Sequence, residues 1–80
     1  MQVESKKDTQ SRNWLFTINN PQQTEVELFE YLKNLSHLKY FAFGREMGDK
    51  EDTPHYQGYI DFTIPKLFSA VKNIFFRATH

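Results

Sequence analysis

Apolar and polar residues follow two different spacings in the first half of the chain. Residues 13–19 (NWLFTIN) are rich in aromatic and β-branched side chains, and Asn20-Pro21 follows them, so we predict a strand that ends in a turn. Thr24 and Glu27 form a capping-box pattern. The apolar residues that follow recur at helical spacing, which predicts an amphipathic helix over residues 25–35.

The second half predicts two more strands, a helix and part of a further strand. Residues 39–46 and 55–62 are the predicted strands, and the charged segment 47–54 between them is a loop that lets them pair antiparallel. Pro65 suits the first turn of a second helix, whose apolar stripe is Leu67, Phe68, Val71 and Ile74. Residues 75–80 (FFRATH) predict the start of a fourth strand.

The predicted order β-α-β-β-α-β defines the fold class. It is α+β, with a ferredoxin-like split β-α-β antiparallel sheet that carries both helices on one face. The other face of the sheet is then open and is where we expect function. Residues 1–12 are polar and predict a flexible N-terminal arm, so the domain is expected to occupy residues 13–80.

Composition narrows the class of protein. With 80 residues, 39% of them apolar and 16% aromatic, the chain suits one small globular domain rather than a disordered segment. It has no cysteine, which excludes a disulfide scaffold, a thiolate zinc finger and a cysteine nucleophile. No apolar run approaches the roughly 20 residues of a membrane span, and the first residues lack the core of a secretory leader, so we expect no membrane partner.

Charge adds one local feature. The formal net charge is zero, which argues against a general polyanion binder. Beyond Thr63, however, the chain carries three bases and no acid, and these bases are candidates for phosphate contacts: Lys66, Lys72 and Arg77. An ordinary solvated surface explains the same charges equally well.

Three polar side chains suggest a metal site on the open face. Strand alternation places His55, Gln57, Tyr59 and Asp61 on one face of the predicted strand 55–62. If Glu46 on the neighbouring strand pairs near Gln57, then Glu46, His55 and Gln57 converge. A carboxylate, an imidazole and an amide oxygen, without sulfur, favour Mn²⁺ or Mg²⁺ over a structural Zn²⁺. Three unrelated polar residues on a solvated sheet face remain the alternative.

Two sequence motifs resemble those of a known family. Phe16-Thr17-Ile18-Asn19-Asn20, followed by Pro21, resembles the first motif of replication-initiator (Rep) proteins of small circular single-stranded DNA viruses. His55-Tyr56-Gln57-Gly58, preceded by Thr53-Pro54, resembles their second motif in its circovirus-like and nanovirus-like form. Glu46 stands where that family keeps an acidic metal ligand. The resemblance covers the chain from about Arg12 to its C-terminus.

This resemblance implies an HUH-type endonuclease domain that nicks and rejoins single-stranded viral DNA at a stem-loop origin and so starts rolling-circle replication. It implies metal ligands at Glu46, His55 and Gln57, and a location in the host nucleus. Thr17 and Asn19 would position DNA, and Tyr59 is the candidate for stacking on a base. The metal would polarise the phosphate that a tyrosine hydroxyl attacks.

One family feature is missing from the sequence. The family nucleophile lies in a third motif, Tyr-x-x-Lys, and none of the four tyrosines here has a lysine three residues later. We therefore expect a domain truncated before that motif, which holds the metal half of the site and does not cleave DNA alone. A thin core and a shortened fourth strand also predict a marginal fold, with self-association as one route to stability.

Two other functions fit the same predicted elements. The order β-α-β-β-α-β also builds RNA-recognition domains, which bind single-stranded nucleic acid through aromatic residues on the open face and need no metal. A structural or interaction domain without any ligand is the third possibility. Metal dependence separates the first interpretation from the other two.

Overall fold

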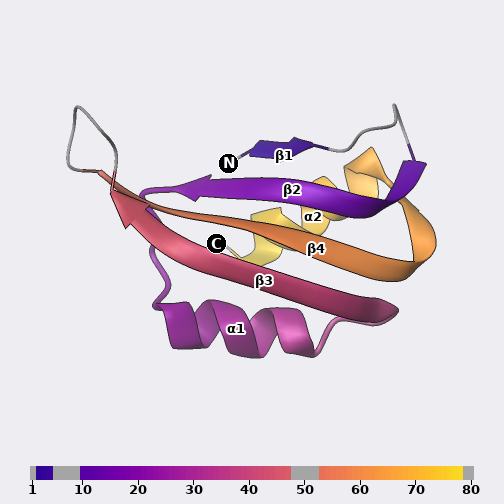
Figure 1. Ribbon diagram of the computed structural model, residues 1–80, viewed down its shortest axis with the longest axis horizontal. Coiled ribbons are helices and arrows are strands. Elements are labelled where there is room, and N and C mark those ends of the chain that lie inside the picture. The colour runs from indigo at the N-terminus through magenta and orange to yellow at the C-terminus, as the bar shows by residue number, and fades with distance from the viewer. Residues whose placement is uncertain (1, 5–9, 48–52, 79–80) are drawn as a thin grey trace.

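The computed structural model describes residues 2–4, 10–47 and 53–78. Along the chain lie β1 (Gln2–Glu4), β2 (Gln10–Asn19), α1 (Glu25–Lys33), β3 (Leu38–Met47), β4 (Pro54–Leu67) and α2 (Phe68–Ala78). The four strands form one antiparallel sheet in the order β1-β2-β4-β3 (Figure 1). The predicted α+β class, an antiparallel sheet with both helices on one face, is confirmed.

A single apolar core fills the space between the sheet and the helices. Strands β2 and β4 contribute every second residue to it, and the helices contribute residues spaced by three or four positions. Its members are Val3, Trp14, Phe16, Ile18, Leu28, Leu32, Tyr56, Ile60, Phe62, Val71, Phe75 and Ala78. The Tyr31 hydroxyl joins the two helices by donating to the carbonyl of Ile74 at 2.8 Å. Burial raises the pKa of Tyr31, while Arg77 acts in the opposite direction.

Helix α1 begins where the capping box predicts. The Thr24 hydroxyl accepts from the backbone N–H of Glu27 at 3.1 Å, and the Glu27 carboxylate accepts from the backbone N–H of Thr24 at 2.8 Å. These bonds satisfy two of the N–H groups that a helix start otherwise leaves without partners. The helix ends at Lys33, two residues earlier than expected, with Asn34 as its C-cap.

The prediction of a flexible arm over residues 1–12 is wrong at both ends of that segment. Residues Gln2–Glu4 form strand β1, which pairs antiparallel with β2 through Val3 opposite Phe16. Val3 is only 8% exposed, because this register places it on the same side as the buried Phe16. Residues 10–12 already belong to β2. The expected loop 47–54 falls largely outside the described residues, as do residues 5–9 of the arm.

The predictions after Phe62 also need correction. Strand β4 continues to Leu67, and the helix begins at Phe68 rather than near Pro65. Pro65 lies where the pairing of β2 with β4 shifts register, a place that tolerates a missing N–H. Residues 75–78, expected as a strand, continue helix α2 because Val71, Phe75 and Ala78 form one buried stripe. The sheet position beside β2 is held by β1.

Neither α1 nor α2 is long and apolar enough to cross a membrane, and this statement covers the described residues.

Candidate functional site

The open face of the sheet carries aligned rows of side chains from its three long strands. Register places Asn19, His55 and Glu46 in one row, and Thr17, Gln57 and Gly44 in the next. Two further rows follow toward the other end of the sheet: Leu15, Tyr59 and Ala42, then Asn13, Asp61 and Tyr40. Residues directly opposite each other in antiparallel strands point to the same face, so each row is a set of neighbours.

Glu46 and His55 form the closest polar pair of the first row. The Nε2 atom of His55 lies 3.3 Å from the Oε2 atom of Glu46, across the paired strands β3 and β4. The Glu46 side chain is 59% exposed and that of His55 is 21% exposed. A pair this open to solvent contributes little to folding. The short distance between Glu46 and His55 therefore results from the register that pairs them across β3 and β4.

The pair suits a divalent cation. Adjacent ligands of an octahedral ion, each about 2.1 Å from it, lie roughly 3 Å apart, close to the distance between Nε2 and Oε2. Gln57 is exposed, projects from the same face and follows two residues after His55. Among the described residues, no three His, Cys, Asp or Glu side chains are grouped to hold a metal. Two amide side chains lie beside the pair on the same face: Asn19, directly opposite His55, and Gln57, two residues further along β4.

The two motif segments are tied together at this end of the sheet. Asn20 has a positive φ of 49°, which asparagine tolerates better than most residues. Its backbone N–H donates to the carbonyl of Pro54 at 2.9 Å. This bond joins the end of β2 to the start of β4, directly beside the pair of Asn19 and His55. This hydrogen bond therefore helps to hold His55 opposite Asn19.

Tyr56 anchors the other face of the same strand. Its ring is buried, with 4% exposed, and its hydroxyl donates to the carbonyl of Gln23 at 2.7 Å. Burial raises the pKa of Tyr56, the negative charges of Glu25 and Glu27 raise it further, and Arg45 acts in the opposite direction. A neutral phenol that keeps its proton is required for this hydrogen bond, and the bond holds the segment before α1 against β4.

Gly58 allows the strands to pack closely next to these residues. A Cβ atom at this position would lie 2.4 Å from the carbonyl oxygen of Ala42 and 2.5 Å from the Cβ of Phe43. Phe16 and Phe43, on either side of Gly58, bring their ring centroids to 6.4 Å. A glycine in a strand marks such a close approach. This contact explains why the tetrapeptide His55-Tyr56-Gln57-Gly58 ends in glycine.

The structure brings together only part of the predicted DNA-binding set. Thr17, Asn19 and Tyr59 lie on the open face with the candidate metal ligands. Lys66 lies near the end of β4, with its ammonium 5.4 Å from the ring centroid of Phe62. Lys72 and Arg77 belong to α2, in the helix layer, and the Lys72 ammonium lies 5.3 Å from the ring centroid of Phe68. Both are therefore away from the open face.

Asn13 is a residue of this face that the sequence prediction missed. Its Nδ2 atom donates to the hydroxyl of Tyr59 at 3.1 Å and to the Oδ1 atom of Asp61 at 2.7 Å. Asn13 is four residues before Thr17 on the same strand, and residues an even number of positions apart share a face. Strand alternation alone could therefore have assigned Asn13 to the open face. Tyr40 completes the group, with its ring centroid 6.2 Å from that of Tyr59.

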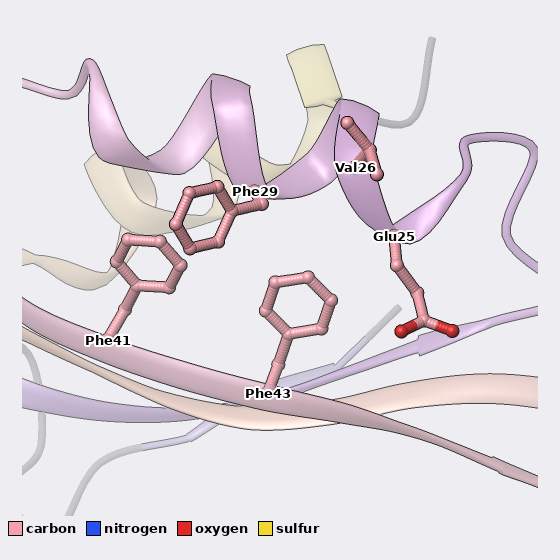
Figure 2. A pocket seen from close by; sticks show the side chains of 5 residues that line it. All are labelled: Glu25, Val26, Phe29, Phe41 and Phe43. Carbon is pink, nitrogen blue, oxygen red and sulfur yellow. The ribbon is translucent and has the colours of Figure 1, made fainter.

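A pocket of about 340 Å³ lies on the helix side, between α1 and β3. Its lining is mostly aromatic and aliphatic: Glu25, Val26, Phe29, Phe41 and Phe43 (Figure 2). The ring centroids of Phe29 and Phe41 lie 5.3 Å apart, and the planes of the two rings are tilted by 56°. The pocket and the polar rows thus lie on opposite sides of the sheet, and none of its lining residues is one of the predicted ligands.

Comparison with known proteins gives consistent matches. Residues 11–80 match the family described as "Putative viral replication protein". The chain is 40% identical over 76 residues to the replication-associated protein of beak and feather disease virus, covering 95% of this chain and 26% of that protein. It is 35% identical over 69 residues to the replication-associated protein of porcine circovirus 1, covering 86% of this chain and 22% of that protein. The chain thus spans about a quarter of the length of these relatives.

Proposed function

Because the chain belongs to the viral replication protein family, we propose that it is the metal-binding part of an endonuclease domain that nicks and rejoins single-stranded DNA to initiate replication. The observation that carries the proposal is the Glu46–His55 pair, 3.3 Å apart on an open sheet face, with Gln57 two residues further along the strand. The relatives are named replication-associated proteins. The spacing of Glu46 and His55 suits a divalent cation that also binds a phosphate oxygen.

Glu46, His55 and Gln57 would hold Mn²⁺ or Mg²⁺. A bound divalent cation supplies Lewis-acid polarisation of the phosphate that is cut. Three protein ligands leave the remaining coordination positions for water and a phosphate oxygen. Asn19 and Thr17 lie in the same two rows as His55 and Gln57 and would hold the DNA backbone across β2 and β4.

The nucleophile is proposed to lie outside these 80 residues. In such a reaction a tyrosine hydroxyl oxygen bonds to phosphorus, the bond to the 3′ oxygen breaks, and a proton passes to that leaving oxygen. Tyr31 and Tyr56 are engaged with backbone carbonyls in the helix layer. Tyr59 accepts a hydrogen bond from Asn13 and lies two rows from His55, and Tyr40 lies three rows from His55. We therefore expect no covalent protein–DNA adduct from this chain alone.

Paramagnetic broadening tests the metal proposal. In NMR spectra of the 80-residue chain, substoichiometric Mn²⁺ should broaden the signals of Glu46, His55 and Gln57 first. His55→Ala should abolish this selective broadening. His37→Asn is the matched control, because His37 is exposed and has a positive φ of 61°, which asparagine accepts. Broadening that spares these residues, or that persists in His55→Ala, would contradict the site.

Fluorescence anisotropy tests the nucleic-acid proposal. Labelled single-stranded DNA, the matching duplex and single-stranded RNA of equal length should be titrated at several salt concentrations, with and without Mn²⁺. We expect weak binding of single-stranded DNA that improves with Mn²⁺ and falls steeply with salt. Binding that prefers RNA and ignores the metal would favour the RNA-recognition interpretation instead.

A further inference from the structure

Away from the candidate ligands, the open face ends in a hydrogen-bonded group whose donors and acceptors can be assigned. Asn13 on β2 donates one amide hydrogen to Tyr59 and the other to Asp61, both on β4. The opposite orientation of the amide would place its oxygen against the Asp61 carboxylate, so the network fixes the side chain. Within the part of the chain that the structure describes, the hydroxyl proton of Tyr59 and the second carboxylate oxygen of Asp61 then remain for a ligand.

Exposed apolar surface surrounds this polar group. Tyr40 lies directly opposite Asp61 and is 56% exposed, and Leu15 lies directly opposite Tyr59 and is 57% exposed. The planes of the Tyr40 and Tyr59 rings are tilted by 51°. Exposed aromatic rings beside polar groups are the arrangement on which nucleobases stack.

We propose that Asn13, Leu15, Tyr40, Tyr59 and Asp61 form a base-reading patch, which binds one nucleobase of the DNA strand and selects adenine, cytosine or guanine over thymine. This inference rests on the function proposed above. The carboxylate of Asp61 repels phosphate, so the group that approaches it must donate an N–H. A base that stacks on the patch removes water from the Asp61 carboxylate. If the base donates no hydrogen bond in return, binding loses free energy, and this loss makes the patch selective among bases.

Base chemistry gives the direction of the selection. Adenine, cytosine and guanine each carry an exocyclic amino group that can donate to Asp61, as carboxylates accept from cytosine N4 in known complexes. Thymine offers only its ring N–H, which lies between two carbonyl oxygens. Both oxygens would face the carboxylate and repel it. Thymine is therefore the base that this patch should reject.

The patch also has a defined distance from the candidate metal ligands. Tyr59 follows His55 by four residues, so the two lie about 14 Å apart along a strand that rises about 3.4 Å per residue. At the duplex spacing of about 3.4 Å per nucleotide this distance covers about four nucleotides, and fewer in an extended strand. The base that is read should therefore lie within about four nucleotides of the metal-bound phosphate.

Selection from a random pool tests the inference. A pool of single-stranded 12-mers is incubated with the immobilised 80-residue chain at low salt with Mn²⁺, and the retained fraction is sequenced. Wild type should deplete thymine at one position of the bound motif by about fivefold or more. Asp61→Asn keeps the shape and can still accept from Asn13, and it should remove the depletion. Tyr40→Ala should weaken retention of all sequences about tenfold by removing a stacking surface.

Glu30→Gln is the matched control for Asp61→Asn. It removes the same negative charge from the exposed face of α1, far from the patch, and should leave the thymine depletion unchanged. If wild type retains DNA with the same base profile as Asp61→Asn, the base-reading patch is wrong but the proposed function is not contradicted. Absence of any retained single-stranded DNA, with or without Mn²⁺, overturns the proposed function and the patch with it.

Discussion

The two faces of strand β4 share one backbone but differ in the burial and polarity of their side chains. On one face Tyr56, Ile60 and Phe62 are at most 4% exposed and pack under the helices. On the other, His55, Gln57, Tyr59 and Asp61 meet solvent or polar neighbours. The same peptide hydrogen bonds support both sets. Only the direction of the side chains separates a core from a candidate site.

This difference has an energetic consequence. Folding depends on apolar area removed from water, which lies on the helix side, while the Glu46–His55 contact of the open face is solvated and contributes little. Substitutions on one face should therefore change stability, and those on the other should change ligand binding. Each of the following predictions tests this separation with one residue and a control from the opposite face or a comparable position.

Removing a core ring should have the largest effect. Phe62→Ala should reduce the free energy of unfolding by about 3–5 kcal/mol, because Phe62 is fully buried and the cavity cannot refill completely. For a domain of this size such a loss leaves little of the total stability. Urea unfolding followed by circular dichroism measures it. Leu15→Ala, on the exposed face of β2, is the control and should cost less than about 1 kcal/mol.

Adding one methyl group should have the next largest effect. Gly58→Ala should destabilise the fold by about 3 kcal/mol, because its Cβ would overlap the backbone of Ala42 and Phe43. Gly44→Ala is the matched control. No atom lies within 4 Å of a Cβ at Gly44, so its unfolding midpoint should stay the same or rise slightly. Equal midpoints for the two variants would contradict the close approach at Gly58.

Removing one hydroxyl should have a smaller, pH-dependent effect. Tyr56→Phe should cost about 1 kcal/mol at neutral pH through the lost bond to Gln23. Because the fold raises the pKa of Tyr56, its contribution is complete below about pH 10 and is lost as the pH rises through the folded pKa. Wild type should thus lose stability above pH 10, and Tyr56→Phe should lose less.

A comparison with Tyr31 controls this experiment. The pKa of Tyr31 is also raised by burial, so Tyr31→Phe should remove part of the alkaline loss as well. The double variant Tyr31→Phe/Tyr56→Phe should show a flatter profile than either single variant. A wild-type stability that does not change between pH 9 and pH 11 would rule out this account of both tyrosines.

Changing the candidate metal ligand should have the smallest effect on stability. His55→Ala should shift the free energy of unfolding by less than about 0.5 kcal/mol in the absence of metal, since its partner Glu46 is largely exposed. With saturating Mn²⁺ the wild type should gain stability through binding and the variant should not. A large loss for His55→Ala without metal would mean that the open face also supports the fold.

Much of the fold could be predicted because local patterns determine it. The capping box at Thr24 located the start of α1, and alternation along residues 55–62 assigned each side chain to its face. The antiparallel loop predicted that Glu46 lies beside this strand, but it left the register open, and the pairing considered from the sequence was Glu46 near Gln57. The structure pairs Glu46 directly with His55 and places Gln57 opposite Gly44.

Other features depend on contacts between distant residues and left no local signal. Val3 lies alone in a polar segment, and only the pairing of β1 with β2 buries it. Phe75 and Phe76 suggest a strand by their aromatic character, whereas packing of Phe75 on Phe16, with ring centroids 4.5 Å apart, places Phe75 in a helical stripe. Strand alternation indicates the face on which Asn13 lies, but its bonds to Tyr59 and Asp61 span more than 40 positions of sequence and depend on the pairing of β2 with β4.

The alternation along β4 also limits which genetic changes the chain can accept. Deleting one of the codons for Tyr56, Gln57 or Gly58 would shift the residues that follow in β4 to the opposite side of the sheet. Ile60 and Phe62 would then face solvent, and Tyr59 and Asp61 would enter the apolar layer. A three-nucleotide deletion, which preserves the reading frame, should be as damaging here as a frameshift. Homologous sequences should therefore vary by substitution in this segment and keep its length constant.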